Sequence, residues 1–131
     1  MTPSEPKWVS IDQALYIHEQ ALKRHDGGKG LRDRSLLEST MARAENQYNY
    51  IQPDLFELAA TYAVAIAANH PFVDGNKCTT YAVAGLFLYF NGYRLMVANE
   101  QDQIALFENV AEGKTSIGQL ADFYRGNTVE L

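Results

Sequence analysis

The spacing of hydrophobic residues predicts a chain built mainly from helices. Apolar residues recur at intervals of three or four along most of the sequence, and the sustained alternation that is typical of β-strands is absent. In the first helical segment, Ser10 and Gln13 form a capping-box pattern, and an apolar stripe continues to about residue 25. Residues 26–30 hold three glycines, so we expect them to break the chain before the next helix.

A second helix is expected after Asp33, whose carboxylate can cap the N-terminus. Its apolar positions are Leu36, Leu37, Met41 and Ala44. Residues 46–53 are then expected to form a linker. This linker is more aromatic than a solvated loop usually is, because it contains Tyr48 and Tyr50.

The third predicted helix, residues 55–69, differs from the others because apolar residues occupy nearly every face of it. Such a helix is expected to be buried on all sides and therefore central. Asp54 and Glu57 form a capping pair at its start. Pro71 is expected to end it, since the residue before a proline is disfavoured in helical geometry.

Three more helices are expected after this central one. They cover residues 76–90, with Asn91 and Gly92 as the C-terminal cap, residues 99–110, capped by Asn99 and ended by Gly113, and a last segment from Thr115 or Ser116 toward Tyr124. Residues 93–98 are expected to be a short extended piece. The whole pattern predicts an all-α fold of about six helices around a central buried helix, in a single domain over residues 1–131.

Composition agrees with this picture and narrows the possible ligands. Of the 131 residues, 47% are hydrophobic and 21% are charged, which is typical of a globular domain. The net charge of −5 disfavours a broad electrostatic contact with nucleic acid, so an anionic ligand would need a local cationic site or a metal ion. The single cysteine, Cys78, excludes an internal disulfide, and no apolar stretch is long enough to span a bilayer. We therefore expect a cytoplasmic protein.

Residues 70–77 (HPFVDGNK) lie between two apolar helices and contain several side chains that can bind ligands or transfer protons. The N-terminus of the helix that follows offers unpaired N–H groups and a positive dipole end, which favour phosphate. Gly75 removes a side chain where phosphate must approach the backbone, and Asn76 and Lys77 add an amide donor and a cation. The segment therefore predicts a phosphate-binding loop.

The same loop holds candidates for a metal ligand and a base. Asp74 would repel phosphate unless a metal ion lies between them, and magnesium prefers carboxylate and phosphate oxygens. His70 is a histidine, the residue type that ordinarily gains and loses a proton near neutral pH. This property suits a group that removes the proton from a hydroxyl. Phe72 is interpreted as an inward structural anchor. Taken singly, these residues are typical of turns and caps; taken together, they favour a functional site.

The string from His70 to Lys77 resembles the signature of the Fic family: histidine, any residue, phenylalanine, any residue, an acid, glycine, asparagine, then glycine or lysine. Lysine at the last position is similar to the Doc (death on curing) branch, toxins of toxin–antitoxin modules. Residues 28–39, the central helix and residues 87–92 also resemble that family. The likeness thus covers nearly the whole chain.

The resemblance implies an all-α Fic fold that uses ATP and Mg²⁺. It assigns His70 as general base, Asp74 as magnesium ligand, and Gly75, Asn76 and Lys77 as the phosphate cradle. A target-docking flap would lie before the central helix, over Tyr48, Asn49, Tyr50 and Ile51. By this resemblance the protein transfers the γ-phosphate of ATP to a threonine of an elongation factor Tu-like translation factor, and a Phd-like antitoxin is its partner.

One departure from the family pattern leaves alternatives open. The family places an arginine after Asn-Lys, where this chain has Cys78, and a second arginine of the AMP-transferring members is replaced by Tyr81. A thiol does not provide the charged fork of donors that binds phosphate. The alternatives to phosphotransfer are AMP transfer to a protein hydroxyl, and a catalytically weak Fic domain that acts by binding a partner.

Overall fold

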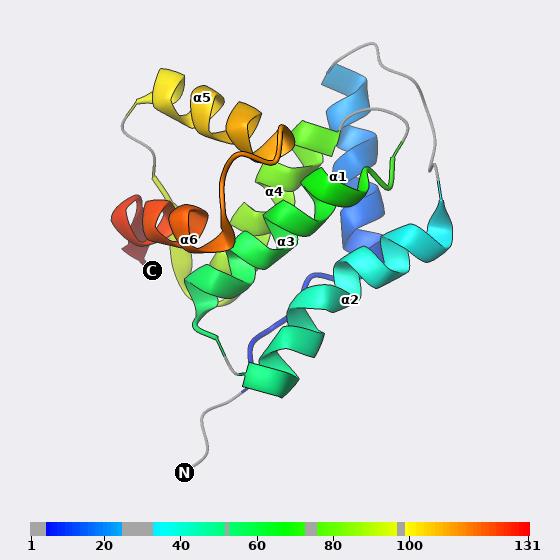
Figure 1. Ribbon diagram of the computed structural model, residues 1–131, viewed down its shortest axis with the longest axis horizontal. Coiled ribbons are helices and arrows are strands. Elements are labelled where there is room, and N and C mark those ends of the chain that lie inside the picture. The colour runs from blue at the N-terminus through cyan, green and yellow to red at the C-terminus, as the bar shows by residue number, and fades with distance from the viewer. Residues whose placement is uncertain (1–4, 25–32, 52, 73–75, 97–98) are drawn as a thin grey trace.

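The computed structural model describes residues 5–24, 33–51, 53–72, 76–96 and 99–131. Within them the chain forms mostly helices, with one small two-stranded sheet (Figure 1). The elements run α1 (Ile11–Arg24), α2 (Arg34–Ile51), α3 (Leu55–Asn69), α4 (Asn76–Phe90), β1 (Tyr93–Leu95), α5 (Glu100–Ala111), α6 (Ile117–Gly126) and β2 (Thr128–Glu130). The predicted all-α class is therefore confirmed.

Helix α3 forms the centre of the molecule, as its apolar composition predicts. It packs against α2, α4, α5 and α6 (Figure 1). Small side chains make this close packing possible: Ala59, Ala60 and Ala63 are fully buried and leave room for neighbouring helices to approach. Larger core residues fill the space between the helices, among them Leu58, Tyr62, Ile66, Phe87 and Leu120.

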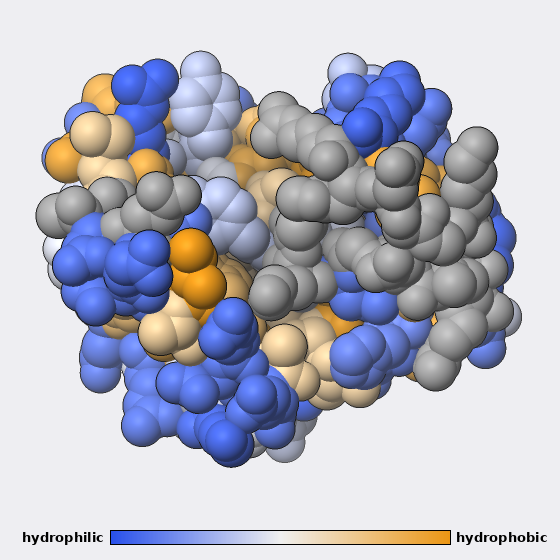
Figure 2. Space-filling view, turned by 90° about the horizontal axis from the view of Figure 1, so that it is seen from above, coloured by the Kyte–Doolittle hydropathy of each residue, from blue (hydrophilic) through white to orange (hydrophobic). Residues whose placement is uncertain are grey.

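The polar surface follows from the same arrangement. Hydrophilic residues cover much of the periphery in the view of Figure 2, and apolar residues show mainly between them. No helix among the described residues is long and apolar enough to cross a membrane.

The start of the described chain is fastened to the central helix through Tyr62. The Val9 N–H donates a hydrogen bond to the Tyr62 hydroxyl over 3.2 Å, in a buried position. Burial of that hydroxyl raises the pKa of Tyr62 to about 12. The contact holds the entry to α1 against the core.

The predicted helix caps are present in the structure. Ser10 and Gln13 exchange side chain-to-backbone hydrogen bonds at the start of α1, and Asp54 and Glu57 form a full capping box at α3. Asp33 accepts a hydrogen bond from the Leu36 N–H before α2. Asn99 caps α5, and of the two candidates for α6 it is Ser116 that caps. These short-range pairs satisfy N–H groups that a helix leaves unpaired.

The linker predicted over residues 46–53 is wrong, because α2 continues to Ile51. No glycine or proline occurs between Asp33 and Pro53, so nothing in the backbone stops the helix. The aromatic residue that suggested a special loop instead packs on the N-terminal segment: the ring centroids of Tyr48 and Trp8 are 5.6 Å apart.

The sheet is the second departure from the prediction. Residues 93–95 are extended as expected, but their partner strand β2 was not predicted. The strands are antiparallel, with Tyr93 opposite Glu130 and Leu95 opposite Thr128. Strands of three residues carry too little alternation to be recognised, and their pairing joins segments more than 30 residues apart in sequence.

Arg125 of α6 ties the C-terminal helix to the start of α3. Its Nη2 lies 2.6 Å from Asp54 Oδ2 and 3.6 Å from Glu57 Oε1, and its Nη1 lies 2.6 Å from Asp122 Oδ1. Burial by itself raises the pKa of Asp54, but hydrogen bonds from Arg125 and from the Glu57 amide outweigh it, so the pKa lies below its ordinary value. The Asp54 cap and the α3–α6 contact therefore share one ion pair.

We predict that Arg125→Met lowers the free energy of unfolding by about 0.5–1 kcal/mol at pH 7, the range of a solvent-screened ion pair. Because the folded-state pKa of Asp54 is lowered, its contribution is complete above the ordinary value of 3.8 and is lost as the pH falls through the folded-state value. Urea unfolding at pH 7 and at pH 3 measures both effects. Lys114→Met, which breaks the exposed pair with Glu112, is the control; equal losses in both variants at pH 7 would contradict a special role for Arg125.

Candidate functional site

The candidate site begins where α3 ends, at His70. This residue is the C-cap of α3 and adopts the left-handed conformation, with φ 46° and ψ 59°. Its N–H still donates to the Ile66 carbonyl over 3.1 Å, and its side chain is exposed. Among the described residues, His70 is the one non-glycine residue with a positive φ.

A left-handed non-glycine residue is unusual and costs about 1 kcal/mol or more. Pro71 explains part of the choice, since it disfavours the right-handed helical conformation at the residue before it. The chain therefore leaves α3 abruptly and places the imidazole at the surface. That position suits a group that must reach a substrate outside the protein.

Phe72 turns the chain back into the core. Its side chain is buried, and its ring lies nearly parallel to the imidazole of His18 in α1, with centroids 3.8 Å apart and planes inclined by 10°. The residue proposed as anchor of the motif is thus packed between elements that are distant in sequence.

Asn76 closes the loop from its other side. Its Nδ2 donates to the Phe72 carbonyl over 2.9 Å, and its Oδ1 accepts from the Phe72 N–H over 3.2 Å. One side-chain amide therefore satisfies both backbone groups of Phe72, as a neighbouring strand would. This pairing gives Asn76 a structural role in shaping the loop; its donation to phosphate stays a prediction.

The start of α4 has the character of an anion site. The helix is 15 residues long and has no acidic residue in its first turn, so no carboxylate within that turn opposes the positive dipole end. The backbone of Lys77 and Cys78 lies in this turn, whereas their side chains are outside the described residues. Asp74 and Gly75 are outside them altogether, so the predicted magnesium ligand and phosphate-facing glycine stay predictions.

Polar contacts fasten the motif to the first part of α2. The Asp33 N–H donates to the Pro71 carbonyl over 3.4 Å, and Asn69 Nδ2 donates to Thr40 Oγ1 over 2.8 Å. Thr40 in turn donates to the Leu36 carbonyl. The N-terminal half of α2 therefore lies beside the end of α3 that carries His70.

This arrangement separates the predicted flap from His70. Tyr48, Asn49, Tyr50 and Ile51 occupy the last turn of α2, which leads into the start of α3, at the far end of that helix (Figure 1). At about 1.5 Å per residue, α3 is roughly 20 Å long. Tyr50 and Ile51 are exposed, 87% and 61% respectively, but the structure does not place them next to the candidate base. Sequence position alone carries no measure of that separation.

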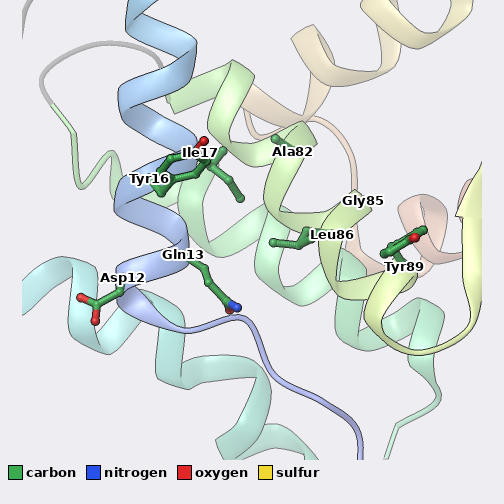
Figure 3. Close-up of a pocket in the computed structure, with 8 residues that line it drawn as sticks. All are labelled: Asp12, Gln13, Tyr16, Ile17, Ala82, Gly85, Leu86 and Tyr89. Carbon is green, nitrogen blue, oxygen red and sulfur yellow. The ribbon is translucent and has the colours of Figure 1, made fainter.

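An open apolar groove of about 610 Å³ lies between α1 and α4 (Figure 3). Its lining residues are Asp12, Gln13, Tyr16, Ile17, Ala82, Gly85, Leu86 and Tyr89. None of the motif residues lines it, and the α4 residues that do, from Ala82 to Tyr89, lie beyond the first turn of that helix. The groove is therefore distinct from the candidate site.

Sequence reasoning missed the contribution of His18. A histidine in mid-helix carries no motif, and its sequence signal is weak: it follows the apolar Ala14 by four residues, so the two share one face of α1, and the structure shows that both are buried. No cluster of three or more metal-ligating side chains occurs within the described residues, which do not include Asp74.

Comparison with known proteins gives three findings. The Fic/DOC family model matches residues 8–88, a span that includes the whole motif. The chain is 32% identical over 118 residues to Protein kinase doc of Escherichia phage P1. The aligned region covers 89% of this chain and 92% of that protein. It is 36% identical over 75 residues to Toxin Doc of Mycolicibacterium smegmatis, covering 56% and 58% of the two chains.

We predict that Asn76→Ala loosens the motif loop. Loss of two hydrogen bonds, each worth about 0.5–1.5 kcal/mol, should speed amide exchange at Phe72 by about tenfold or more. Hydrogen exchange followed by NMR measures this directly. Asn127→Ala, which removes a single bond to the Phe123 carbonyl with the same spacing, is the control and should leave Phe72 unchanged. Unaltered Phe72 exchange in Asn76→Ala would show that the amide does not hold the loop.

Proposed function

The chain belongs to the Fic/DOC family, and on that basis we propose that it is a Doc-type toxin that transfers the γ-phosphate of ATP to a hydroxyl group of a protein. The observation that carries this proposal is the geometry of the motif. An exposed histidine is held at a helix end, directly before a loop that is anchored by Phe72 and Asn76 at the N-terminus of α4. The relatives named as a kinase and as a toxin support it.

In the proposed reaction, His70 acts as general base. The oxygen of the target hydroxyl forms a bond to the γ-phosphorus, while the bond from that phosphorus to the bridging oxygen of ADP breaks. His70 accepts the hydroxyl proton, and ADP leaves. The exposed position of His70 supports this role, because a protein substrate cannot enter a closed cavity.

The residues at the start of α4 fit an anionic nucleotide. The helix N-terminus provides N–H donors without an opposing carboxylate in its first turn, and Lys77 adds a cation. Asp74 is the residue that would hold Mg²⁺ together with phosphate oxygens. When bound, Mg²⁺ neutralises charge that develops on the phosphates during transfer. A local site of this kind is necessary because the chain as a whole carries a net charge of −5.

The proposal extends to target and partner. By its resemblance to the Doc branch, the target is a translation factor similar to elongation factor Tu, so that transfer arrests translation in the cytoplasm. A Phd-like antitoxin is the proposed binding partner. The family names of the relatives support the toxin–antitoxin context.

A second candidate function follows from Cys78. This residue lies in the first turn of α4, where the family pattern has an arginine. Loss of one charge-assisted phosphate contact costs about 1.5–3 kcal/mol, so a weakened enzyme that acts mainly by binding its partner is the alternative. Transfer of AMP is the third possibility and is distinguished by the position of the transferred label.

We predict that label from γ-labelled ATP, but not from α-labelled ATP, is incorporated into a target protein in a lysate. His70→Ala should reduce the rate by about 10²–10⁴-fold, as expected for loss of a positioned base. His25→Ala, a histidine outside the motif, is the control and should retain activity. Incorporation from the α position would establish AMP transfer instead, and full activity in His70→Ala would exclude His70 as the base.

We predict that Cys78→Arg increases the rate of transfer at saturating ATP and the toxicity on expression. A guanidinium in the first turn of α4 would add a permanently charged, bidentate contact to phosphate. Rates of the two proteins against the same substrate measure the effect, and circular dichroism checks that the fold is retained. Equal rates, both above background, would show that the cysteine is a neutral replacement; no activity in either would favour the binding alternative.

A further inference from the structure

His18 touches the motif without belonging to it. It is buried, 5% exposed, and its ring covers the face of Phe72 at a centroid distance of 3.8 Å. The two residues are 54 positions apart in sequence, so this contact is made only by packing α1 against the loop.

Helix α1 provides a firm base for that contact. Ala14, one turn before His18, is fully buried, and Ile17 packs against the core. Figure 3 shows Tyr16 and Ile17 on the part of α1 that runs beside α4. The hydrogen bond from Val9 to Tyr62 fixes the chain just before this helix. His18 is thus held relative to α3 and α4 before any ligand binds.

The connection from Phe72 to His70 is short and stiff. A single residue, Pro71, separates them, and its ring restricts φ to about −65°. The backbone of Phe72 is held by Asn76, and the His70 backbone is bonded to Ile66. A displacement of Phe72 would therefore be transmitted to His70 through a single stiff residue.

We propose that His18 is a positioning residue: by stacking on Phe72, it holds His70 where it accepts the proton of the target hydroxyl. This inference rests on the proposed function. A flat ring is needed because a parallel stack fixes both the position and the plane of Phe72, whereas an aliphatic side chain of similar volume fills the space and leaves the ring free to tilt. Small displacements of a catalytic group are costly, up to about 10²-fold per ångström.

The first test separates positioning from binding. His18→Leu should reduce kcat by about tenfold or more, while the Kd for ATP measured by calorimetry stays within about twofold. His18→Phe restores a flat ring and should recover most of kcat. The control is Phe56→Leu, which removes an aromatic contact with Tyr93 at the opposite end of α3 and should lower Tm without a comparable loss of kcat.

Several outcomes of this test would overturn the inference. They are an unchanged kcat in His18→Leu, a loss of kcat that follows Tm equally in the Phe56→Leu control, and a failure of His18→Phe to recover activity in a folded protein. The first two would show that the histidine fills the core without orienting the motif, and the third would show that a flat ring at this position is not what orients it.

The second test does not depend on activity. The chain contains three histidines, so the ring signals of a histidine-labelled sample are readily assigned by NMR. His18→Leu should shift or broaden the ring signal of His70, and Phe56→Leu should leave it unchanged. If the wild-type protein shows no transfer, the proposed function fails, but the spectrum still tests the positioning role of His18. An unaltered His70 signal in His18→Leu would overturn that role.

Discussion

The packing of four helices around α3 governs how both ends of that helix are built. Its alanines let α2, α4, α5 and α6 approach closely, and burial of its larger side chains supplies the apolar contacts of the core. Each end of such a helix must satisfy its backbone groups without disturbing the packing. At the start, the Asp54 cap does so and also receives Arg125 from α6. At the end, the chain turns sharply at His70.

The sharp turn at the end of α3 also shapes the candidate site. The left-handed His70 leaves the helix axis, and Phe72 immediately returns to the core against His18. A single residue, Pro71, separates His70 from Phe72, so the backbone between them has little freedom to relax. The exposed imidazole of His70 is therefore held next to the buried residues Pro71 and Phe72. The cost of the unusual backbone conformation at His70 is offset by this burial and by the two hydrogen bonds between the Asn76 side chain and the Phe72 backbone, of which Asn76 donates one and accepts the other.

The net charge of the chain explains why a site for an anionic ligand would have to be confined to a small region of the surface. A chain with a net charge of −5 repels anions at long range, so an anionic ligand needs a local site, and the first turn of α4 contains no carboxylate that would oppose one. The Fic/DOC family model covers this turn, and phosphate binding there is part of the proposed function. In the proposed function, Cys78 stands where the family pattern has an arginine, so phosphate binding would rest on the helix end and Lys77.

The helices, their caps and the position of the motif could be predicted from the sequence, because these depend on residues close together in the chain, mostly three or four apart. Asp54 with Glu57, and Ser10 with Gln13, are contacts that spacing alone predicts. Three features required the folded structure: residues 46–51 extend α2 away from His70, β1 pairs with β2, and His18 stacks on Phe72. Each of these joins segments distant in the chain or depends on packing against them, and periodicity in one segment carries no information about its partner.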